Sequence, residues 1–320
     1  MAGIDFNTGV TTVTWTVYDD EGNSDFCSFD ITVTDNDLPT LTRIDDEIRK
    51  TDAGGCDYTV VGAEFDLTGA ADNCGVVDTT YTLSGATIIA ETSSRTLAGI
   101  DFNTGVTTVT WTVYDDQGNS DFCSFDITVT DNELPTLTCI ADDSRNTDAG
   151  ECDYTVVGAE FDLTGAGDNC GVVDTTYTLS GATVVAETSS RTLAGIDFNT
   201  GVTTVTWTVY DAQGNSDFCS FDITVTDNEL PTLTCIADDS RNTDGGECDY
   251  TVVGAEFDLT GAGDNCGVVD TTYTLSGATV IAETSGRTLA GIDFNTGVTT
   301  VTWTVYDAEG NSDFCSFDIT

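Results

Sequence analysis

The chain has 320 residues, of which 56 are Asp or Glu and 8 are Lys or Arg, for a formal net charge of −48 at pH 7. Nucleic acids and anionic membrane surfaces bind basic faces, so this charge disfavours both as partners, and we expect no direct membrane contact from this segment. The apolar fraction of 39% argues against a disordered chain. A solvated acidic surface suited to saline water would also explain the charge.

An internal period of 96 residues organises the sequence. The segment AGIDFNTGVTTVTWTVYD begins at Ala2, Ala98, Ala194 and Ala290, with no insertion or deletion between copies. A period of this length is the size of a small domain and exceeds the units of solenoid proteins, which run about 20–45 residues. The sequence therefore predicts a string of modules, and we expect it to be a piece of a longer array.

A proline marks the start of each module. Pro39, Pro135 and Pro231 are the only prolines, and each lies just after an Asp-Asn-acid triplet. Proline lacks a backbone N–H, so it suits the first residue of an edge strand. The expected domains are the C-terminal half of a truncated module at 1–36, and three complete modules at 37–132, 133–228 and 229–320. We call the complete modules the first, second and third copies.

Taken in chain order, the second copy contains predicted strands in TLTCI, YTVVGAEF, VVDTTYTL, ATVVAE, VTTVTWTVYD and FCSFDITV. In VTTVTWTVYD, Val205, Trp207 and Val209 alternate with threonines, a pattern typical of a half-buried strand. The intervening DAQGNS carries Gly-Asn turn chemistry, which predicts a hairpin with the last strand. No stretch has helical periodicity. Short strands throughout predict an all-β, immunoglobulin-like sandwich.

The cysteines and the missing histidine limit the chemistry. Twelve cysteines without a single histidine or CxxC pair favour disulfides over zinc or redox motifs, and hence an oxidising, extracellular setting. Without histidine, a Ser-His-Asp or Cys-His site is excluded. Adjacent acids such as Asp142–Asp143 recur once per module, which favours structural ion binding over catalysis. We do not expect an enzyme.

The segments DNELPTLTC, GEC, GDNCG and GVTTVTWTVYDAQGNSDFCSFDITVT together resemble the HYR (hyalin repeat) module. The closing D-x-x-G-N-x-x-x-C-x-F is the most specific part, and the resemblance covers the whole chain. Ile140 and Trp207 depart from the proline and tyrosine usual in the family. The resemblance implies immunoglobulin-like β-sandwiches in a linear array. It also implies non-enzymatic adhesion, as in large surface adhesins of Bacteroidota, including the gliding-motility type.

The resemblance also implies a cysteine pairing, because two-cysteine members of the family keep the first and last positions. The implied pairs are Cys139–Cys219 and Cys235–Cys315. The pairs that this leaves are Cys152–Cys170, Cys248–Cys266 and Cys56–Cys74. Arg43 replaces the first cysteine in the first copy, so Cys123 is expected to be a free thiol, as is Cys27 in the half module. Four cysteines permit three connectivities, and disulfides that clamp neighbouring modules are the alternative.

Acidic loops are expected to gather at each module junction. In an immunoglobulin-like sandwich, the loop between the last two strands and the GDNCG loop both lie at the N-terminal end, beside the linker. TDNELP also looks like the cadherin linker phrase D-x-N-D-N-x-P, and calcium prefers oxygen ligands from Asp and Asn. The alternative is that these residues form turns and solvate the surface. The candidate ligands for structural Ca²⁺ are Asp131, Asn132, Glu133, Asp168, Asn169, Asp211, Asn215, Asp217, Asp227, Asn228, Glu229, Asp264, Asn265, Asp307, Asn311 and Asp313.

Two functions fit this sequence. The first is a stalk or filament segment of a cell-surface adhesin, whose modules give length and calcium-stiffened reach; its partners are further copies of the module. The second is that the modules themselves bind glycans, other adhesin chains or each other, since weak sites gain from repetition. In both cases the protein is secreted and lies at the cell surface, with an anchor outside this segment.

Salt should stabilise the chain. At low ionic strength the Debye length is about 30 Å at 0.01 M, so like charges repel one another across each module. We expect the melting temperature to rise with monovalent salt even in the presence of a chelator. A melting temperature that does not respond to salt would show that the acids lie too far apart to matter.

Overall fold

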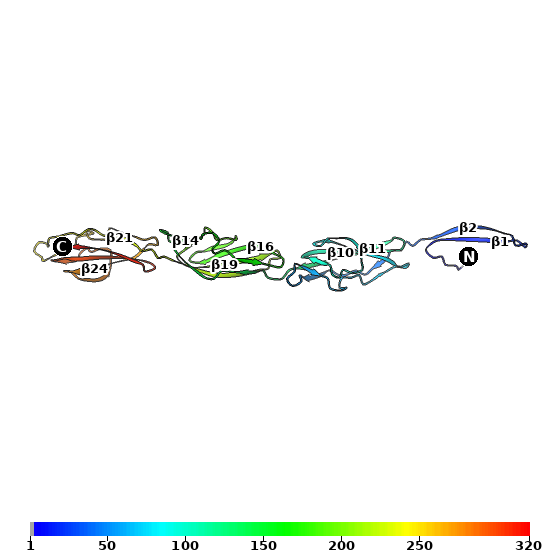
Figure 1. Ribbon diagram of the computed structural model, residues 1–320, viewed down its shortest axis with the longest axis horizontal. Helices are drawn as coiled ribbons and strands as arrows, with labels where there is room; N and C mark the ends of the chain where they lie inside the picture. Colours follow the sequence, from blue (N-terminus) through cyan, green and yellow to red (C-terminus); the bar gives the residue numbers. More distant parts are fainter. Residues whose placement is uncertain (1–2) are drawn as a thin grey trace. The chain divides into compact units, whose positions relative to one another are not determined.

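The computed structural model describes residues 3–320, which contain 28 β-strands and no α-helix (Figure 1). The prediction of tandem all-β, immunoglobulin-like modules is confirmed. None of these residues forms a helix long and apolar enough to cross a membrane. The chain forms two compact units, which are described separately. One unit holds residues 3–134 with the loop segments Asp168–Gly171 and Ala212–Asn215, and the other holds 135–167, 172–211 and 216–320.

The half module forms β1 (Gly9–Tyr18) and β2 (Ser24–Val33). The first copy forms β3 (Thr40–Leu41), β4 (Glu47–Lys50), β5 (Asp57–Thr59), β6 (Ala70–Ala71), β7 (Val76–Gly85), β8 (Ile89–Ser93), β9 (Asp101–Asn103), β10 (Gly105–Asp115) and β11 (Ser120–Thr130). The second copy forms β12 (Thr136–Thr138), β13 (Asp143–Asn146), β14 (Asp153–Thr155), β15 (Gly165–Gly167), β16 (Val172–Gly181), β17 (Val185–Ser189), β18 (Asp197–Asn199), β19 (Gly201–Asp211) and β20 (Ser216–Thr226). The third copy forms β21 (Thr232–Thr234), β22 (Asp249–Thr251), β23 (Gly261–Gly263), β24 (Val268–Gly277), β25 (Ile281–Ser285), β26 (Asp293–Asn295), β27 (Thr299–Asp307) and β28 (Ser312–Ile319).

The first and second copies share one topology, shown here for the second, and the third copy differs only at the sheet edge, where an isolated bridge between Asp239 and Ile319 replaces the edge strand. The large sheet of the second copy has the strand order β13-β20-β19-β16-β17, and the short pairs β12-β15 and β14-β18 form the facing layer. The predicted hairpin is β19–β20, with Trp207 opposite Cys219. The predicted strand YTVVGAEF is wrong beyond Thr155, because Gly158 has a positive φ and turns follow it. Strands β13, β15 and β18 were not expected.

One tryptophan lies at the centre of each complete core. Trp207 is fully buried with Val205, Phe221 and Ile223 from the same sheet, against Phe161 and other side chains of the facing layer. Its indole N–H donates to the carbonyl oxygen of Phe161 over 3.2 Å, which gives the buried donor a partner. The alternating pattern that predicted this inner face therefore describes the core correctly.

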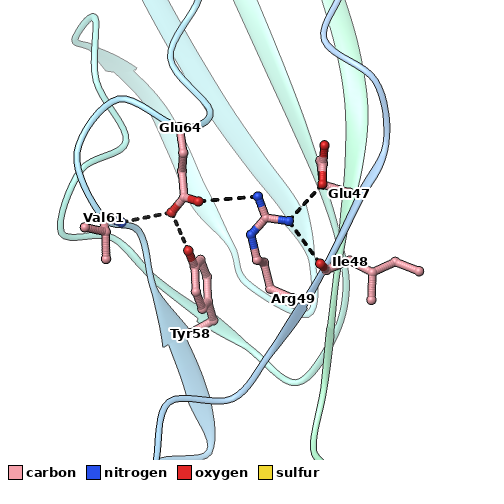
Figure 2. Close-up of polar contacts among 6 residues, drawn as sticks. All are labelled: Glu47, Ile48, Arg49, Tyr58, Val61 and Glu64. Carbon is pink, nitrogen blue, oxygen red and sulfur yellow. Dashed lines mark hydrogen bonds and ion pairs between the residues drawn. The ribbon is translucent and has the colours of Figure 1, made fainter.

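An arginine covers the core from the side in each complete copy. Arg49, on β4, holds its guanidinium 4.9 Å from the ring centroid of Phe65 and ion-pairs with Glu47 over 2.8 Å. The hydroxyl of Tyr58 donates to Glu64, which also accepts the backbone N–H of Val61 over 2.9 Å. Figure 2 shows this network of Glu47, Ile48, Arg49, Tyr58, Val61 and Glu64. Arg145 and Arg241 repeat it with Glu160 and Glu256.

The network lowers the pKa of its half-buried glutamate. Burial acts to raise the pKa of Glu160, but hydrogen bonds from Tyr154 and the Val157 N–H, together with Arg145, outweigh it, and the pKa falls below its ordinary value of 4.5. The pKa of Glu64 falls for the same reasons, and that of Glu256 chiefly through Tyr250. A carboxyl with a lowered folded-state pKa stabilises the fold above its ordinary value, and this contribution is lost as the pH falls through the folded-state pKa.

We predict that the triple variant Glu64→Gln, Glu160→Gln, Glu256→Gln loses about 1 kcal/mol per copy at pH 7, because the hydrogen bonds from the tyrosine hydroxyls then go to a neutral group and no longer to a charged one. The loss should shrink as the pH falls below 4.5, where the native glutamates also become protonated. Thermal melts between pH 3 and pH 7 measure this difference. The control, Glu309→Gln, changes an exposed turn residue and should melt like the native chain at every pH.

Candidate cation and disulfide sites at the repeat junctions

The linker between β20 and β21 carries a buried carboxylate at Asp227, which is 4% exposed. Its Oδ1 accepts hydrogen bonds from the Glu229 N–H, the Thr147 hydroxyl and the Asn265 amide, at 3.1, 3.2 and 3.0 Å. These donors come from the second copy, the linker and the third copy. Asp227 therefore joins the two copies at one point.

Two further carboxylates face Asp227. One ligand atom from each of Asp227, Asp264 and Asp307 lies within 4.8 Å of the others. Asp264 is on the loop after β23, and its Oδ2 accepts the Cys266 N–H over 2.8 Å. Asp307 ends β27, is buried, and accepts both the backbone and amide N–H groups of Asn311 over 2.7 Å. The expectation that the two loops and the linker converge agrees with these distances.

Three oxygens of this cluster are buried without a hydrogen-bond partner in the described chain: Asp227 Oδ2, Asp264 Oδ1 and Asn265 Oδ1. Buried carboxylates at this separation repel each other, and an unpartnered acceptor adds its own desolvation cost. A bound cation would remove both penalties at once. The oxygens fit a hard cation such as Ca²⁺, which takes carboxylate and amide oxygens as ligands.

Other residues expected in this ligand set have different roles. Asn228 is exposed, and Glu229 accepts the Gly150 N–H over 2.9 Å through its carboxylate. The amide of Asn311 is a donor, to Asp307 and to the Asp227 carbonyl oxygen over 3.1 Å. Asp313 lies on β28 and accepts the Phe314 N–H over 2.8 Å. The cluster is thus smaller than the sequence predicts.

The unit that begins at residue 3 contains the equivalent cluster one period earlier. Asp131 is buried, and its Oδ1 accepts the Asn169 amide over 3.2 Å and the Thr51 hydroxyl over 3.1 Å. Asp131 Oδ2, Asp168 Oδ1 and Asn169 Oδ1 are again buried without a partner. Ligand atoms of Asp131, Asp168 and Cys170 lie within 4.8 Å of one another.

The remaining candidates of this period divide between the two units. In the first unit, Asn132 is exposed, Glu133 accepts the Gly54 N–H over 2.9 Å, and Asn215 donates to the Asp131 carbonyl oxygen over 3.1 Å. In the second unit, Asp211 is buried at the end of β19, and Asp217 accepts the Phe218 N–H over 2.9 Å.

The disulfides bring a correction. The structure pairs Cys139 with Cys219 and Cys235 with Cys315, the two bonds that the family resemblance implies. The expected loop pairs are wrong: Cys56 bonds Cys170 and Cys152 bonds Cys266, each across 114 residues and with Cα atoms 4.8 Å apart. These bonds join consecutive copies. The pairs Cys152–Cys170, Cys248–Cys266 and Cys56–Cys74 do not form.

The first copy shows why a loop pair within one copy cannot close. Cys74 lies beside Asp35 in the linker that precedes the copy, since its thiol donates to that carboxylate. Cys56 lies beside the linker that follows the copy, where the Gly55 carbonyl oxygen accepts the Asn169 amide over 2.7 Å. The two cysteines occupy opposite ends of one sandwich. Their separation along the sequence concealed this.

Four cysteines have free thiols: Cys27, Cys74, Cys123 and Cys248. Free thiols at Cys27 and Cys123 agree with the expectation, whereas Cys74 and Cys248 were expected to be bonded. Burial raises the pKa of Cys123, and the Asp121 carboxylate adds to this effect. The hydrogen bond to Asp35 raises the pKa of Cys74, and burial adds to it.

Sequence reasoning missed two kinds of contributor to the junctions, threonine hydroxyls and a backbone carbonyl oxygen. Thr147 and Thr51 donate hydroxyl protons to the linker carboxylates, and the Glu151 carbonyl oxygen accepts the Asn265 amide over 2.8 Å. The signal that could have found them is the turn around the second cysteine of each copy. This turn recurs at the same position in every copy. The sequence prediction paired its cysteine within the same copy and so did not place the turn at the junction.

Comparison with known proteins identifies the family. The HYR domain model matches residues 1–33, 34–129, 130–225 and 226–320. The chain belongs to the HYR family. The prolines predicted module boundaries at residues 37, 133 and 229, and the matched segments start three residues before each of them. The boundaries themselves stay predictions.

Two relatives are named hyalin. Hyalin of Strongylocentrotus purpuratus is 31% identical over 240 residues, 72% of this chain and 17% of that protein. Hyalin of Lytechinus variegatus is 28% identical over 258 residues, 78% of this chain and 43% of that protein. The chain thus spans less than half the length of either relative.

Among solved structures, protocadherin gamma B2 extracellular cadherin domains 1–5 is 11% identical, with a TM-score of 0.33 over 97% of this chain and 72% of that one.

We predict that alkylation of the denatured, unreduced protein labels Cys27, Cys74, Cys123 and Cys248. Peptide mapping should then recover Cys56 linked to Cys170 and Cys152 linked to Cys266. The four remaining bonded cysteines, Cys139–Cys219 and Cys235–Cys315, act as the internal control, because their pairing lies within one copy. A peptide linking Cys152 to Cys170 would contradict the junction geometry.

Proposed function

We propose that this chain is a repetitive structural segment of an extracellular, adhesion-related protein, in which successive copies give length and calcium stiffens the junctions. One observation carries the proposal. Each junction between complete copies places buried, unpartnered carboxylate oxygens beside a linker aspartate that both neighbouring copies contact. The family match and the two hyalin relatives support an adhesion-related role. The gliding-adhesin context and a cell-surface anchor stay predictions.

The disulfides support the extracellular setting. Four bonds hold eight of the twelve cysteines, and such bonds persist in oxidising compartments. Two of the four cross a junction. A disulfide between copies limits how far the two copies can separate, so the same contact that places the acids also resists extension. This arrangement suits a spacer.

Calcium fits the donor set better than a softer metal. The cluster around Asp227 offers carboxylate oxygens and the amide oxygen of Asn265, and its one nearby sulfur, Cys266, is in a disulfide. Zinc and copper sites favour histidine or thiolate ligands, whereas calcium takes six to eight oxygens and tolerates water among them. The residues we assign to the ion are Asp227, Asp264, Asn265 and Asp307.

A second candidate function is multivalent binding by the copies themselves. Each complete copy has a hollow beside its first long strand, which is β16 in the second copy, where the hollow measures about 240 Å³. One arginine lines each of the three hollows. Arg95, Arg191 and Arg287 have no ion pair among residues 3–320, which leaves them free for a glycan. Glycan pull-down by the native array and by Arg191→Ala distinguishes this function from a spacer.

We predict opposite effects of Asp227→Asn with and without calcium. In chelator the variant should melt at a higher temperature than the native chain, because an amide N–H replaces the unpartnered Oδ2 facing Asp264 and Asp307. In millimolar calcium it should melt at a lower temperature, because the native site gains binding energy on folding and the variant loses one ligand.

Calorimetric titration gives the second readout, since the variant should release less heat on calcium binding. The control is Asp20→Asn, which makes the same change of net charge on an exposed turn. If the native chain shows neither heat nor a calcium-dependent melting temperature, the acids serve only as turn formers and solvated surface.

A further inference from the structure

The disulfide between the first and second copies lies directly beside the acidic cluster of that junction. Cys170 follows Asp168 and Asn169 in the sequence and bonds Cys56 of the preceding copy. Its sulfur lies within 4.8 Å of one carboxylate oxygen from each of Asp131 and Asp168. The Asn169 amide donates to that sulfur over 3.6 Å. The covalent bond and the candidate ligands thus share one short loop.

Hydrogen bonds tie this loop to the same turn that the disulfide holds. The Asn169 amide donates to the carbonyl oxygen of Gly55, the residue before Cys56, over 2.7 Å. The same amide donates to Asp131 Oδ1 over 3.2 Å, while the Asn169 Oδ1 is buried without a partner in the described chain. The bond to Cys56 therefore limits how far the Asn169 oxygen and the linker carboxylate can separate.

The junction between the second and third copies repeats these contacts. Cys266 follows Asp264 and Asn265 and bonds Cys152 of the second copy. The Asn265 amide donates to the Cys266 sulfur over 3.7 Å. It also donates to the carbonyl oxygen of Glu151, the residue before Cys152, over 2.8 Å. The relation between the disulfide and the candidate ligands therefore belongs to the repeat and not to one loop.

The two disulfides within copies have different surroundings. Cys139 and Cys219 pack against the apolar core of the second copy, and Cys235 and Cys315 pack against that of the third. None of these four cysteines belongs to an acidic cluster formed by residues 3–320. They provide an internal control for any effect of a cation on the junction disulfides.

We propose that each junction disulfide and the calcium ion of that junction stabilise one another, so that an oxidised junction binds calcium more tightly than a reduced one. This inference rests on the proposed function, from which it takes the ion. While the disulfide is intact, the loop and the linker stay together despite the repulsion between their carboxylates. After reduction the empty cluster can relieve this repulsion by opening, and binding must then close it again, which weakens the apparent affinity.

The coupling is reciprocal. If the disulfide tightens calcium binding by a given factor, calcium must shift the thiol–disulfide equilibrium toward the bonded form by the same factor. Couplings between two sites are typically about 5- to 150-fold, and we expect a value in this range. The covalent link between copies is then harder to reduce in calcium and easier to reduce in chelator.

The reductant in the test is a dithiol, dithiothreitol. Its thiolate attacks one sulfur of the Cys152–Cys266 bond, and the other sulfur leaves as a thiolate and takes up a proton. The second thiolate of dithiothreitol then displaces the first sulfur, which also takes up a proton. Two electrons pass from the dithiol to the protein disulfide, and dithiothreitol leaves as its cyclic disulfide, so no other reactant is needed.

The test titrates the full chain with mixtures of reduced and oxidised dithiothreitol, once in calcium and once in chelator. Alkylation traps the thiols, and peptide mapping then reports the reduction of each disulfide separately. For the two junction disulfides, the ratio of reduced to oxidised dithiothreitol at half-reduction should rise about 5- to 150-fold in calcium. For the two disulfides within copies, the ratio should not change.

A single substitution separates this effect from general stabilisation by calcium. Asp227→Asn removes a ligand only at the junction between the second and third copies, so Cys152–Cys266 should lose its calcium-dependent shift. The disulfide Cys56–Cys170, at the unchanged junction, should keep its shift. It is the matched control within the same molecule.

Calorimetry measures the coupling from the calcium side. The double variant Cys152→Ser, Cys266→Ser keeps the carboxylates but lacks the bond, and it should bind calcium more weakly at that junction by the factor found in the redox titration. The redox titration of the native chain does not depend on whether this variant folds.

The outcomes distinguish this inference from the proposed function. A native chain that binds calcium by calorimetry, but whose junction disulfides do not respond to it, overturns the coupling alone. Equal shifts for all four disulfides, or a shift at Cys152–Cys266 that survives Asp227→Asn, also overturn the coupling. A native chain that binds no calcium overturns the proposed calcium site and the coupling together.

Discussion

Burial of one tryptophan side chain distinguishes the complete copies from the half module, and the rest of each sandwich is built around it. The two long strands pair in the same register wherever they occur, so Trp15 and Trp207 stand opposite the equivalent cysteines. Only in the complete copies does the facing layer cover the ring and accept its N–H. Removing a buried aromatic of this size costs about 3–5 kcal/mol, more than any surface ion pair in the chain can offer. The stability of the sandwich therefore depends on the facing layer.

Alternation along the strands made the hairpin and its inner face predictable, because a period of two has one physical meaning in a half-buried strand. The short facing strands were less predictable. Strand β14 has three residues, and β13 carries Asp143 and Arg145, whose charges give no strand signal. Arg145 lies on the core edge through its stacking on Phe161 and its ion pairs with Asp143 and Glu160. Such a network depends on tertiary contacts that composition does not reveal.

The candidate site was predictable in position but not in detail. Turn chemistry and an immunoglobulin-like topology were enough to bring Asp227, Asp264 and Asp307 together. They could not show that Asn311 donates, or that Cys152 reaches into the next copy. The loop pairs were those left over once the resemblance implied the first and last cysteines, and strand order already fitted them poorly. In a sandwich, successive loops alternate between the two ends, so neighbours in sequence can lie at opposite ends.

The junction also explains why nearly identical copies suit this chain. Asp227 accepts from Thr147 of one copy and Asn265 of the next, and Cys152 bonds Cys266 in the same place. A substitution on one side would leave a buried carboxylate or a thiol without its partner on the other. The core disulfide is different, since the first copy keeps its fold with Arg43 at the first position and a free thiol at Cys123. A copy can thus lose an internal bond more readily than half of a junction, and the junction is the contact that identical copies preserve.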